Sequence, residues 1–217
     1  MNPDVIFIPE IRSPQRETIS YICRIKPYLY LSDFEAASAS HVLKKLNIRL
    51  VICLSYTEHS SVVKYDYRCD GIAVKYFKVD DDPSVDLMPI CNRIHLLIEK
   101  TISHSKKQAD RSILLHCHGG VSRSPTAVLY HLMKGWKMTY WDAYTYVKQL
   151  RPIICPNDGF KQQLQQYETT QAIEDFIKEL PTYEPNQTTS VIEKVIEYLV
   201  WAQRNTNSKL TTDKQTQ

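Results

Sequence analysis

Apolar residues follow two patterns along the chain: short unbroken runs, and longer stretches in which they recur every three or four positions. A short unbroken run predicts a buried strand, because a strand covered on both faces needs no polar side. The wider spacing predicts a helix with one apolar face. We expect strands at residues 28–31, 48–54, 72–79 and 112–116, and helices at 34–46, 87–102, 124–134, 140–150 and 160–178.

The order of these elements predicts the fold class. Strands that alternate with helices favour an α/β fold, with a central, mostly parallel sheet flanked by helices. In such sheets, binding sites lie beyond the carboxyl ends of the strands. Gly135 is expected to join two of the helices. Residues 1–20 are expected to be irregular, apart from a short edge strand at residues 5–8 that Pro3 and Pro9 limit.

The chain divides into three parts. An N-terminal extension, residues 1–20, precedes one folded domain at residues 21–180. Residues 181–217 are expected to hold a linker, an amphipathic helix at about residues 190–202 and a disordered polar tail. The start of the helix is indicated by Ser190 and Glu193, which fit a capping box. We expect this helix to dock on the domain, and the alternative is a homodimer contact.

Charge and composition exclude several classes of function. The net charge of +3 is too small to favour nucleic acid or a membrane surface as a partner. No apolar run reaches the roughly eighteen residues that a membrane span needs, and the N-terminus does not read as a signal peptide. None of the six cysteines lies in a C-x-x-C pair, so we expect reduced thiols in a cytoplasmic and/or nuclear protein.

One segment indicates a specific chemistry: His116-Cys117-His118-Gly119-Gly120-Val121-Ser122-Arg123-Ser124. It lies between a predicted strand and a predicted helix, where backbone N–H groups and the helix N-terminus favour an anion. Arg123 can donate two N–H groups to phosphate oxygens. Such surroundings lower the pKa of a thiol, which makes Cys117 a candidate nucleophile. A bare Cys-x5-Arg spacing is expected about 0.3 times by chance, and the flanking His, Gly and Ser reduce that to the order of 10⁻⁵.

This segment resembles the signature His-Cys-x-x-Gly-x-x-Arg-Ser/Thr of the protein tyrosine phosphatase superfamily. Its Gly-Val-Ser-Arg-Ser ending is similar to that of the small, atypical dual-specificity phosphatases. Residues 28–32 resemble the first core strand of that family, and residues 143–160 resemble its closing helix and loop. Gly119 is a departure, since Ala is more usual there. The resemblance covers about residues 21–170 and implies that residues 21–180 are a dual-specificity phosphatase catalytic domain.

The resemblance implies a two-step reaction. The Cys117 thiolate attacks phosphorus and forms a cysteinyl-phosphate, and Ser124 hydrogen-bonds the thiolate and helps it to leave. His116 orients the loop and keeps the thiol ionised, while Asn157 braces the loop from a nearby turn. The phosphate oxygens are expected to bind Arg123 and the loop residues His118, Gly119, Gly120, Val121 and Ser122.

The implied substrates are phosphotyrosine and phosphoserine/threonine in proteins. No metal or other cofactor is expected, because the nucleophile is a thiolate. RNA 5′-phosphates and phosphoinositides are alternative substrates, although relatives that use them often have extra basic residues in the loop, and residues 118–122 include no Lys or Arg. A phospho-binding pseudoenzyme is a further alternative, which the presence of both Cys117 and Arg123 disfavours.

Three consecutive aspartates, Asp80 to Asp82, lie about thirty-five residues before Cys117, where the family has its acid loop. The family pattern Asp-x-Pro-Ser-x-x-Leu fits when Asp81 is its first residue. Asp81 is therefore the predicted general acid, and Asp82 is the second candidate. A like-charged neighbour can keep a carboxyl group protonated near neutrality. The alternative for the triplet is a solvated acidic turn.

The remaining cysteines and histidines carry weaker signals. Cys53 ends a predicted strand on the same side of the sheet as Cys117, so a reversible Cys53–Cys117 disulfide is one hypothesis. An ordinary buried core cysteine is the other. Five histidines outside the loop show no metal-binding spacing, and no role is assigned to them: His41, His59, His95, His104 and His131.

Overall fold

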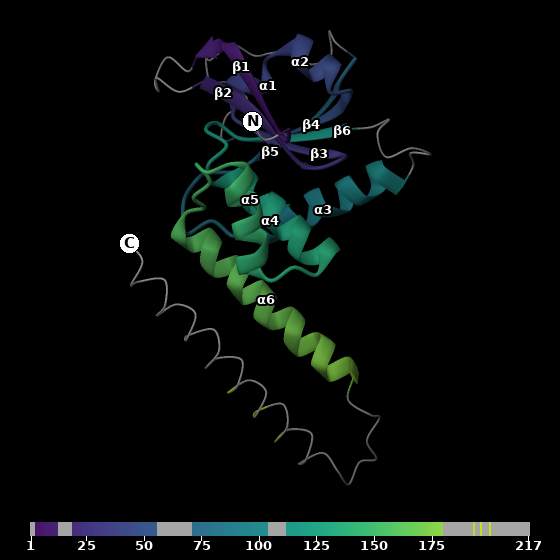
Figure 1. The fold of residues 1–217 in the computed structure, drawn as a ribbon. Helices are drawn as coiled ribbons and strands as arrows, with labels where there is room; N and C mark the ends of the chain where they lie inside the picture. The colour runs from purple at the N-terminus through teal and green to yellow at the C-terminus, as the bar shows by residue number, and fades with distance from the viewer. Residues whose placement is uncertain are drawn as a thin grey trace. The chain divides into compact units, whose positions relative to one another are not determined.

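Six strands among the described residues form one mixed sheet, in the order β1-β2-β3-β6-β4-β5 (Figure 1). The computed structural model describes residues 3–12, 19–55, 71–103 and 112–179, and also residues 193, 196 and 200. The strands are β1 (Val5–Arg12), β2 (Ile19–Lys26), β3 (Leu29–Ser32), β4 (Ile48–Ser55), β5 (Ala73–Lys78) and β6 (Ser112–His116).

The sheet is mostly parallel. β3, β6, β4 and β5 run parallel to one another, and β1 and β2 add an antiparallel edge beside β3. The predicted α/β class with a mostly parallel sheet is confirmed. Because β3, β4 and β6 point the same way, the segments that follow them meet at one edge of the sheet. Cys117 directly follows β6, which lies between β3 and β4.

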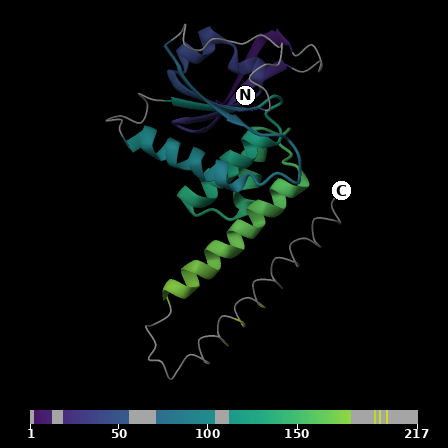
Figure 2. The same ribbon diagram turned by 180° about the vertical axis from the view of Figure 1, so that it is seen from behind.

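Helices cover both faces of this sheet (Figures 1 and 2). Leu114 packs in a cluster with residues of α1 and α2, and its neighbours Ile113 and Leu115 point to the opposite face, since side chains alternate along a strand. That opposite face is covered by α4 and α5, and α3 packs against α4. The helices are α1 (Phe34–Ala37), α2 (Ser40–Lys45), α3 (Met88–Ser103), α4 (Arg123–Trp136), α5 (Tyr140–Leu150) and α6 (Asp158–Glu179).

The N-terminal strands differ from the prediction. β1 is an edge strand, as expected, but it extends to Arg12 and has an irregular register beyond Phe7. β2 was not predicted, because Arg24 and Lys26 interrupt its apolar pattern. The structure gives both cations partners at the sheet edge: Arg24 pairs with Asp4 at 2.6 Å, and the Lys26 ammonium lies 3.8 Å from the Trp136 ring centroid.

Two helix boundaries also differ. The predicted helix at 34–46 is divided into α1 and α2, and Ser38, which ends α1, turns its hydroxyl back onto the carbonyl of Phe34 at 3.0 Å. The expected joint at Gly135 is wrong. α4 continues through Gly135 to Trp136, and the chain turns at Lys137, which has a φ of 55°.

The predicted capping box and most of the predicted helix at about residues 190–202 lie outside the described residues. Glu193, Ile196 and Val200 are helical and exposed. Among the helices that the structure describes, none has both the length and the apolar composition that crossing a bilayer requires.

Candidate active site

The Cys117 thiol is buried at the carboxyl end of β6. Cys117 is 2% exposed. The hydroxyl of Ser124, in the first turn of α4, donates a hydrogen bond to Sγ of Cys117 at 3.2 Å. A strand and a helix therefore fix the thiol from two sides. The loop between them, residues 117–123, is called the cysteine loop below.

Four consecutive carbonyl groups of the cysteine loop accept hydrogen bonds from outside the loop. The carbonyl of His118 accepts from the Phe34 amide at 3.0 Å, and that of Val121 accepts from the Cys155 amide at 2.7 Å. The carbonyls of Gly119 and Gly120 both accept from the guanidinium of Arg151, at 3.3 and 2.9 Å.

These outward carbonyls determine where the loop amides point. In a trans peptide the C=O and the following N–H point in opposite directions, and no described peptide is cis. The N–H groups of the next four residues, 119 to 122, therefore face away from the outer partners and toward the inside of the loop. Such a curve of amides is an anion-binding concavity, and the N-terminus of α4 adds to it.

Arg151 is the main residue that the sequence analysis missed. Its side chain is fully buried, and it also donates to the Tyr21 carbonyl at 3.0 Å and to the Asp33 carboxylate at 3.1 Å. Asp33 in turn caps α1 by accepting from the Ala36 amide at 2.8 Å. One guanidinium thus ties the cysteine loop to β2 and to the start of α1.

Gly120 lies where no side chain fits. Its φ is +60°, and a Cβ there would lie 2.5 Å from the Ser32 carbonyl oxygen and 2.6 Å from Nη2 of Arg151. The loop therefore approaches the end of β3 as closely as a backbone can. Gly120 is required both for its left-handed conformation and for this contact.

Arg123 lies at the rim of the concavity. Its side chain is 12% exposed, and Nη1 donates to the Val79 carbonyl at 3.3 Å. Nε is buried and makes no hydrogen bond within the described structure, although it forms an ion pair with Asp81 at 3.5 Å. A buried guanidinium N–H without a hydrogen bond is costly, so this geometry suits an anionic ligand.

Asp81 lies against the cysteine loop, whereas Asp82 does not contact it. Asp81 accepts from the Ser122 hydroxyl at 2.6 Å and from the Asn157 amide at 2.9 Å. Asp82 accepts instead from the hydroxyl and the backbone amide of Ser84, and these hydrogen bonds lower the pKa of Asp82. The like-charged neighbours therefore do not keep Asp82 protonated.

The segment that carries Asp81, residues 80–87, is called the acid loop and is held by the first turns of α6. Gln163 bonds the Leu87 amide at 2.9 Å and the Val85 carbonyl at 2.8 Å. Gly159 packs directly on Pro83, because a Cβ at Gly159 would overlap the Pro83 carbonyl. The first turns of α6 thus position the acid loop.

Asn157 and Ser122 connect the two loops. The Asn157 backbone amide donates to the Ser122 hydroxyl at 3.1 Å, while its side chain also accepts from the Phe160 amide at 2.9 Å. The structure therefore brings together the predicted residues Cys117, Ser122, Arg123, Ser124, Asp81 and Asn157. The His118 side chain is exposed, and Asp80 is exposed as well.

His116 and Cys53 lie beneath the site on neighbouring strands, paired in register. The His116 Nδ1 lies 3.1 Å from the Cys117 carbonyl, and burial lowers the pKa of His116 to about 4, so the ring is neutral. Burial and the nearby Cys117 raise the pKa of Cys53 to about 12. Both cysteines are free thiols, and the disulfide between them stays a prediction.

Comparison with known proteins places this geometry in a family. The family model of the dual specificity phosphatase catalytic domain matches residues 29–170. Dual specificity protein phosphatase 18 of Homo sapiens is 35% identical over 170 residues, covering 76% of this chain and 81% of that protein. Dual specificity protein phosphatase 19 of Mus musculus is 30% identical over 145 residues, covering 66% of this chain and 60% of that protein.

Solved structures agree with the sequence relatives. The crystal structure of human DUSP28 has a TM-score of 0.59 and 27% sequence identity, and the match covers 70% of this chain and 95% of that chain. The chain spans less than two thirds of several relatives' length, 60% for the mouse protein and 66% and 28% for two others. Since the segment at residues 29–170 contains the cysteine loop, the acid loop and the anchors that hold them, the chain belongs to the dual specificity phosphatase family.

Proposed function

We propose that this protein hydrolyses phosphotyrosine and phosphoserine/threonine in proteins through a cysteinyl-phosphate intermediate. The observation that carries the proposal is the buried Cys117 thiol beside the inward-facing N–H groups of residues 119–122. The carbonyls of the same four peptide groups all accept hydrogen bonds from outside the loop. Membership of the dual specificity phosphatase family supports the same chemistry. No step requires a metal, because a thiolate is a sufficient nucleophile.

In the first step, Sγ of Cys117 attacks phosphorus and the bond from phosphorus to the leaving oxygen breaks. The amides of residues 119–122 and the guanidinium of Arg123 bind the non-bridging oxygens, whose charge they stabilise in the transition state. The proton that the leaving oxygen needs comes from Asp81. The products are the dephosphorylated residue and a phosphorus–sulfur bond on Cys117.

In the second step, water attacks the phosphorus and the phosphorus–sulfur bond breaks. Asp81 accepts the proton from this water, acting now as a base. The hydroxyl of Ser124, 3.2 Å from Sγ, donates to the departing thiolate and stabilises its negative charge. Inorganic phosphate leaves, and the enzyme regains its starting protonation.

Two observations support Asp81 rather than Asp82 as the acid. Asp81 contacts Ser122 and Arg123, so its carboxyl group already lies beside the cysteine loop. The Asp82 carboxyl group accepts its two hydrogen bonds from Ser84, a residue of its own loop. In this proposal Asp82 shapes the acid loop.

Protein substrates are favoured over RNA 5′-phosphates or phosphoinositides by the lack of Lys or Arg at residues 118–122. A second anionic group on the ligand would require additional cations around the concavity. A phospho-binding pseudoenzyme is disfavoured because both the Cys117 nucleophile and the Arg123 guanidinium are present.

The test is phosphate release by the 217-residue chain with a metal chelator present. Four substrates are compared: a phosphotyrosine peptide, a doubly phosphorylated Thr/Tyr peptide, a 5′-triphosphate RNA and a phosphoinositide. We expect turnover of the peptides, none with Cys117→Ser, and a loss of about 10²- to 10⁴-fold in kcat with Asp81→Asn. The matched control, Asp82→Asn, is expected to lose less than about threefold.

The outcomes separate the parts of the proposal. Turnover of only the RNA or the phosphoinositide leaves the mechanism in place but contradicts the substrate class. Binding of phosphopeptide without any turnover contradicts catalysis and supports the pseudoenzyme. A larger loss with Asp82→Asn than with Asp81→Asn reverses the assignment of the acid.

The catalytic domain is proposed to extend over residues 21–180, with the extension at 1–20 and the segment at 181–217 outside it. Limited proteolysis followed by mass spectrometry tests these boundaries. Light scattering of the full chain and of a form ending at residue 180 tests whether the C-terminal helix forms a homodimer. A dimer that survives the truncation contradicts that role.

The proposed location is the cytoplasm, the nucleus or both, where the active thiol stays reduced. Imaging of a fluorescent fusion in cells, with markers for both compartments, tests this proposal. Accumulation in a secretory compartment contradicts it.

A further inference from the structure

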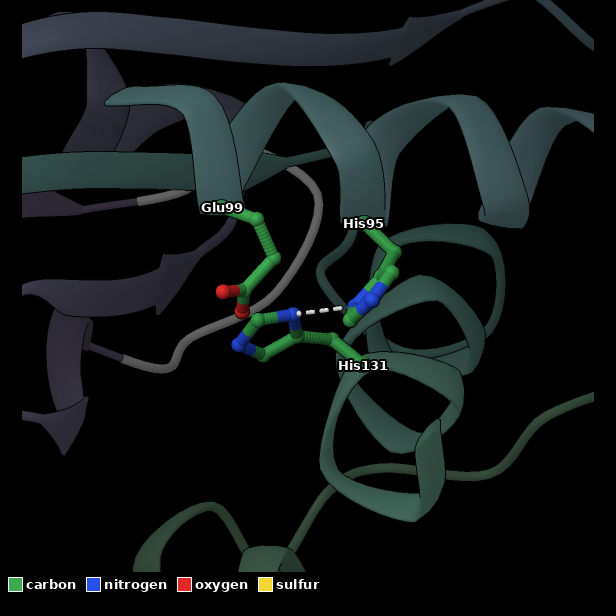
Figure 3. Close-up of side chains that lie close together, drawn as sticks. All are labelled: His95, Glu99 and His131. Atoms are coloured by element: carbon green, nitrogen blue, oxygen red, sulfur yellow. Dashed lines mark hydrogen bonds between the residues drawn. The ribbon is translucent and has the colours of Figure 1, made fainter. Parts of the chain in front are cut away.

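A second cluster of reactive side chains lies between α3 and α4 and includes none of the residues of the proposed reaction. His95 and Glu99 are four residues apart on α3, so they lie on the same face of that helix, and His131 faces them from α4 (Figure 3). One ligand atom from each of the three residues lies within 4.8 Å of the other two. The two helices pack directly against each other.

The two imidazoles point their Nδ1 atoms at each other, 3.0 Å apart. Tetrahedral zinc bonds of 2.0–2.1 Å to two histidines place their nitrogens about 3.3 Å apart. Replacing the shared proton by a cation thus requires the two nitrogens to separate by about 0.3 Å and both rings to turn so that each Nδ1 lone pair points at the metal. The Glu99 carboxylate is half-buried and lies beside the His131 ring (Figure 3), and its ligand oxygen lies within 4.8 Å of a ring nitrogen of each histidine, so it can supply the third ligand.

The orientation of the His131 ring is fixed from its far side. His131 is fully buried, and its Nε2 lies 3.2 Å from the Tyr28 hydroxyl, which accepts a hydrogen bond from the Trp136 indole at 3.3 Å. Metal-binding histidines typically have such a partner on the second nitrogen. Nδ1 of His131 is free to coordinate when Nε2 carries the ring proton and donates it to the Tyr28 hydroxyl.

Gly135 leaves the cluster open on one side. A Cβ at Gly135 would lie 3.4 Å from Cε1 of His95 and 3.7 Å from Oε1 of Glu99, while Gly135 itself is exposed. Glu99 is half-buried, so water can reach its carboxylate on this side, whereas His131 is fully buried. A fourth coordination position occupied by water is therefore compatible with the structure.

Two lysines near the cluster oppose a cation, and each has another interaction. The Lys134 ammonium donates to the Asn92 side chain at 2.7 Å. The Lys26 ammonium lies over the Trp136 ring at 3.8 Å. Glu99 supplies the negative charge within the cluster itself.

We propose that Nδ1 of His95, Nδ1 of His131 and a carboxylate oxygen of Glu99 bind Zn²⁺, with water as the fourth ligand. Two histidines and one glutamate are a common zinc ligand set. His131 is eight residues beyond Arg123 on α4, about 12 Å along the helix, so the metal takes no part in phosphoryl transfer. Its role is to cross-link α3 and α4, and the proposal does not depend on the proposed function.

The test is calorimetric titration of the full chain with Zn²⁺, in a Cys117→Ser background because thiolates also bind zinc. We expect one zinc per chain. Glu99→Gln and His95→Gln are each expected to weaken zinc binding by more than the roughly 10- to 100-fold that loss of an outer partner costs. The matched controls, Glu174→Gln and His41→Gln, change exposed residues and are expected to alter affinity less than about twofold.

Cobalt absorption spectroscopy gives an independent result. A tetrahedral cobalt spectrum without a thiolate charge-transfer band, and its loss in Glu99→Gln, supports the proposal. Absence of zinc binding overturns it, as does zinc affinity that is unchanged in Glu99→Gln and His95→Gln. Glu99→Gln keeps the shape of a half-buried side chain, so misfolding of the His95 variant would not prevent a decision.

Discussion

Arg151→Met tests the idea that one buried guanidinium holds the cysteine loop in its anion-binding shape. The methionine side chain is apolar and replaces the aliphatic part of arginine, but it donates no hydrogen bond. The substitution leaves the carbonyls of Gly119 and Gly120 without their Arg151 donors and leaves the Asp33 carboxylate without its cation. We expect a large loss of stability together with a loss of kcat.

The magnitude follows from the burial of Arg151. Breaking a buried ion pair by removing one partner costs about 3–5 kcal/mol. The Asp33 side chain is 12% exposed and can regain some water, so we expect about 4 kcal/mol. With a urea m-value of about 2 kcal/mol/M, that corresponds to a decrease of about 2 M in the unfolding midpoint.

Urea unfolding followed by circular dichroism measures this shift. The matched control is Arg49→Met, which changes an exposed arginine on β4 and is expected to cost less than about 0.5 kcal/mol. A midpoint within about 0.5 M of the wild type for Arg151→Met would refute the reasoning.

A double-mutant cycle isolates the ion pair. Asn at position 33 removes the carboxylate charge and can still accept from the Ala36 amide. If the pair matters, Asp33→Asn costs less in the Arg151→Met background than in the wild type, because the unpaired charge is then absent. Additive costs would show that the Asp33 ion pair contributes nothing, and that Arg151 acts through its hydrogen bonds to backbone carbonyls and its packing.

Three further predictions concern the surroundings of the site. Gly159→Ala is expected to displace the acid loop at Pro83 and to reduce kcat about 10²-fold, while the rate of Cys117 alkylation stays unchanged. Equal decreases in kcat and in the alkylation rate would contradict a role confined to the acid loop. Burial lowers the pKa of His116 from 6.5 to about 4. Between pH 6.5 and pH 4 the imidazole is therefore protonated in the unfolded state but not in the folded state, so the free energy of unfolding decreases as the pH falls. From about pH 7.5 to about pH 5, the unfolding free energy of His116→Gln should fall by about 2 kcal/mol less than that of the wild type. Equal decreases in the two proteins would contradict this. Peroxide treatment is expected to yield a Cys53–Cys117 disulfide peptide by mass spectrometry, absent in Cys53→Ser, and to do so slowly because the pKa of Cys53 is raised to about 12. Complete oxidation of Cys117 without this peptide would count against the disulfide.

Much of the fold could be predicted because its elements have local patterns. β4, β6 and α3 each have an apolar run or stripe within a single stretch of sequence. The residues placed by the resemblance could be identified because each lies in a short motif, and the motifs around Asp81, Cys117 and Asn157 lie together in the structure.

The parts that could not be predicted depend on contacts between distant residues. Arg151 bonds Asp33 and Tyr21, 118 and 130 positions away, and in the sequence it resembles an exposed charge before a proline. β2 was missed because its cations find partners only once β1 and α4 are in place. His95 and His131 lie on different helices, so their spacing along the chain did not indicate a shared site.

The outward carbonyls of the cysteine loop have a consequence for the evolution of substrate preference. His118 and Val121 hold the loop through backbone atoms alone, while their side chains are exposed and half-exposed. Position 120, in contrast, tolerates no side chain at all. Phosphate recognition is therefore independent of the side chains at 118 and 121. Selection, natural or in the laboratory, can vary these two positions to change which molecules are accepted and leave the reactive centre intact.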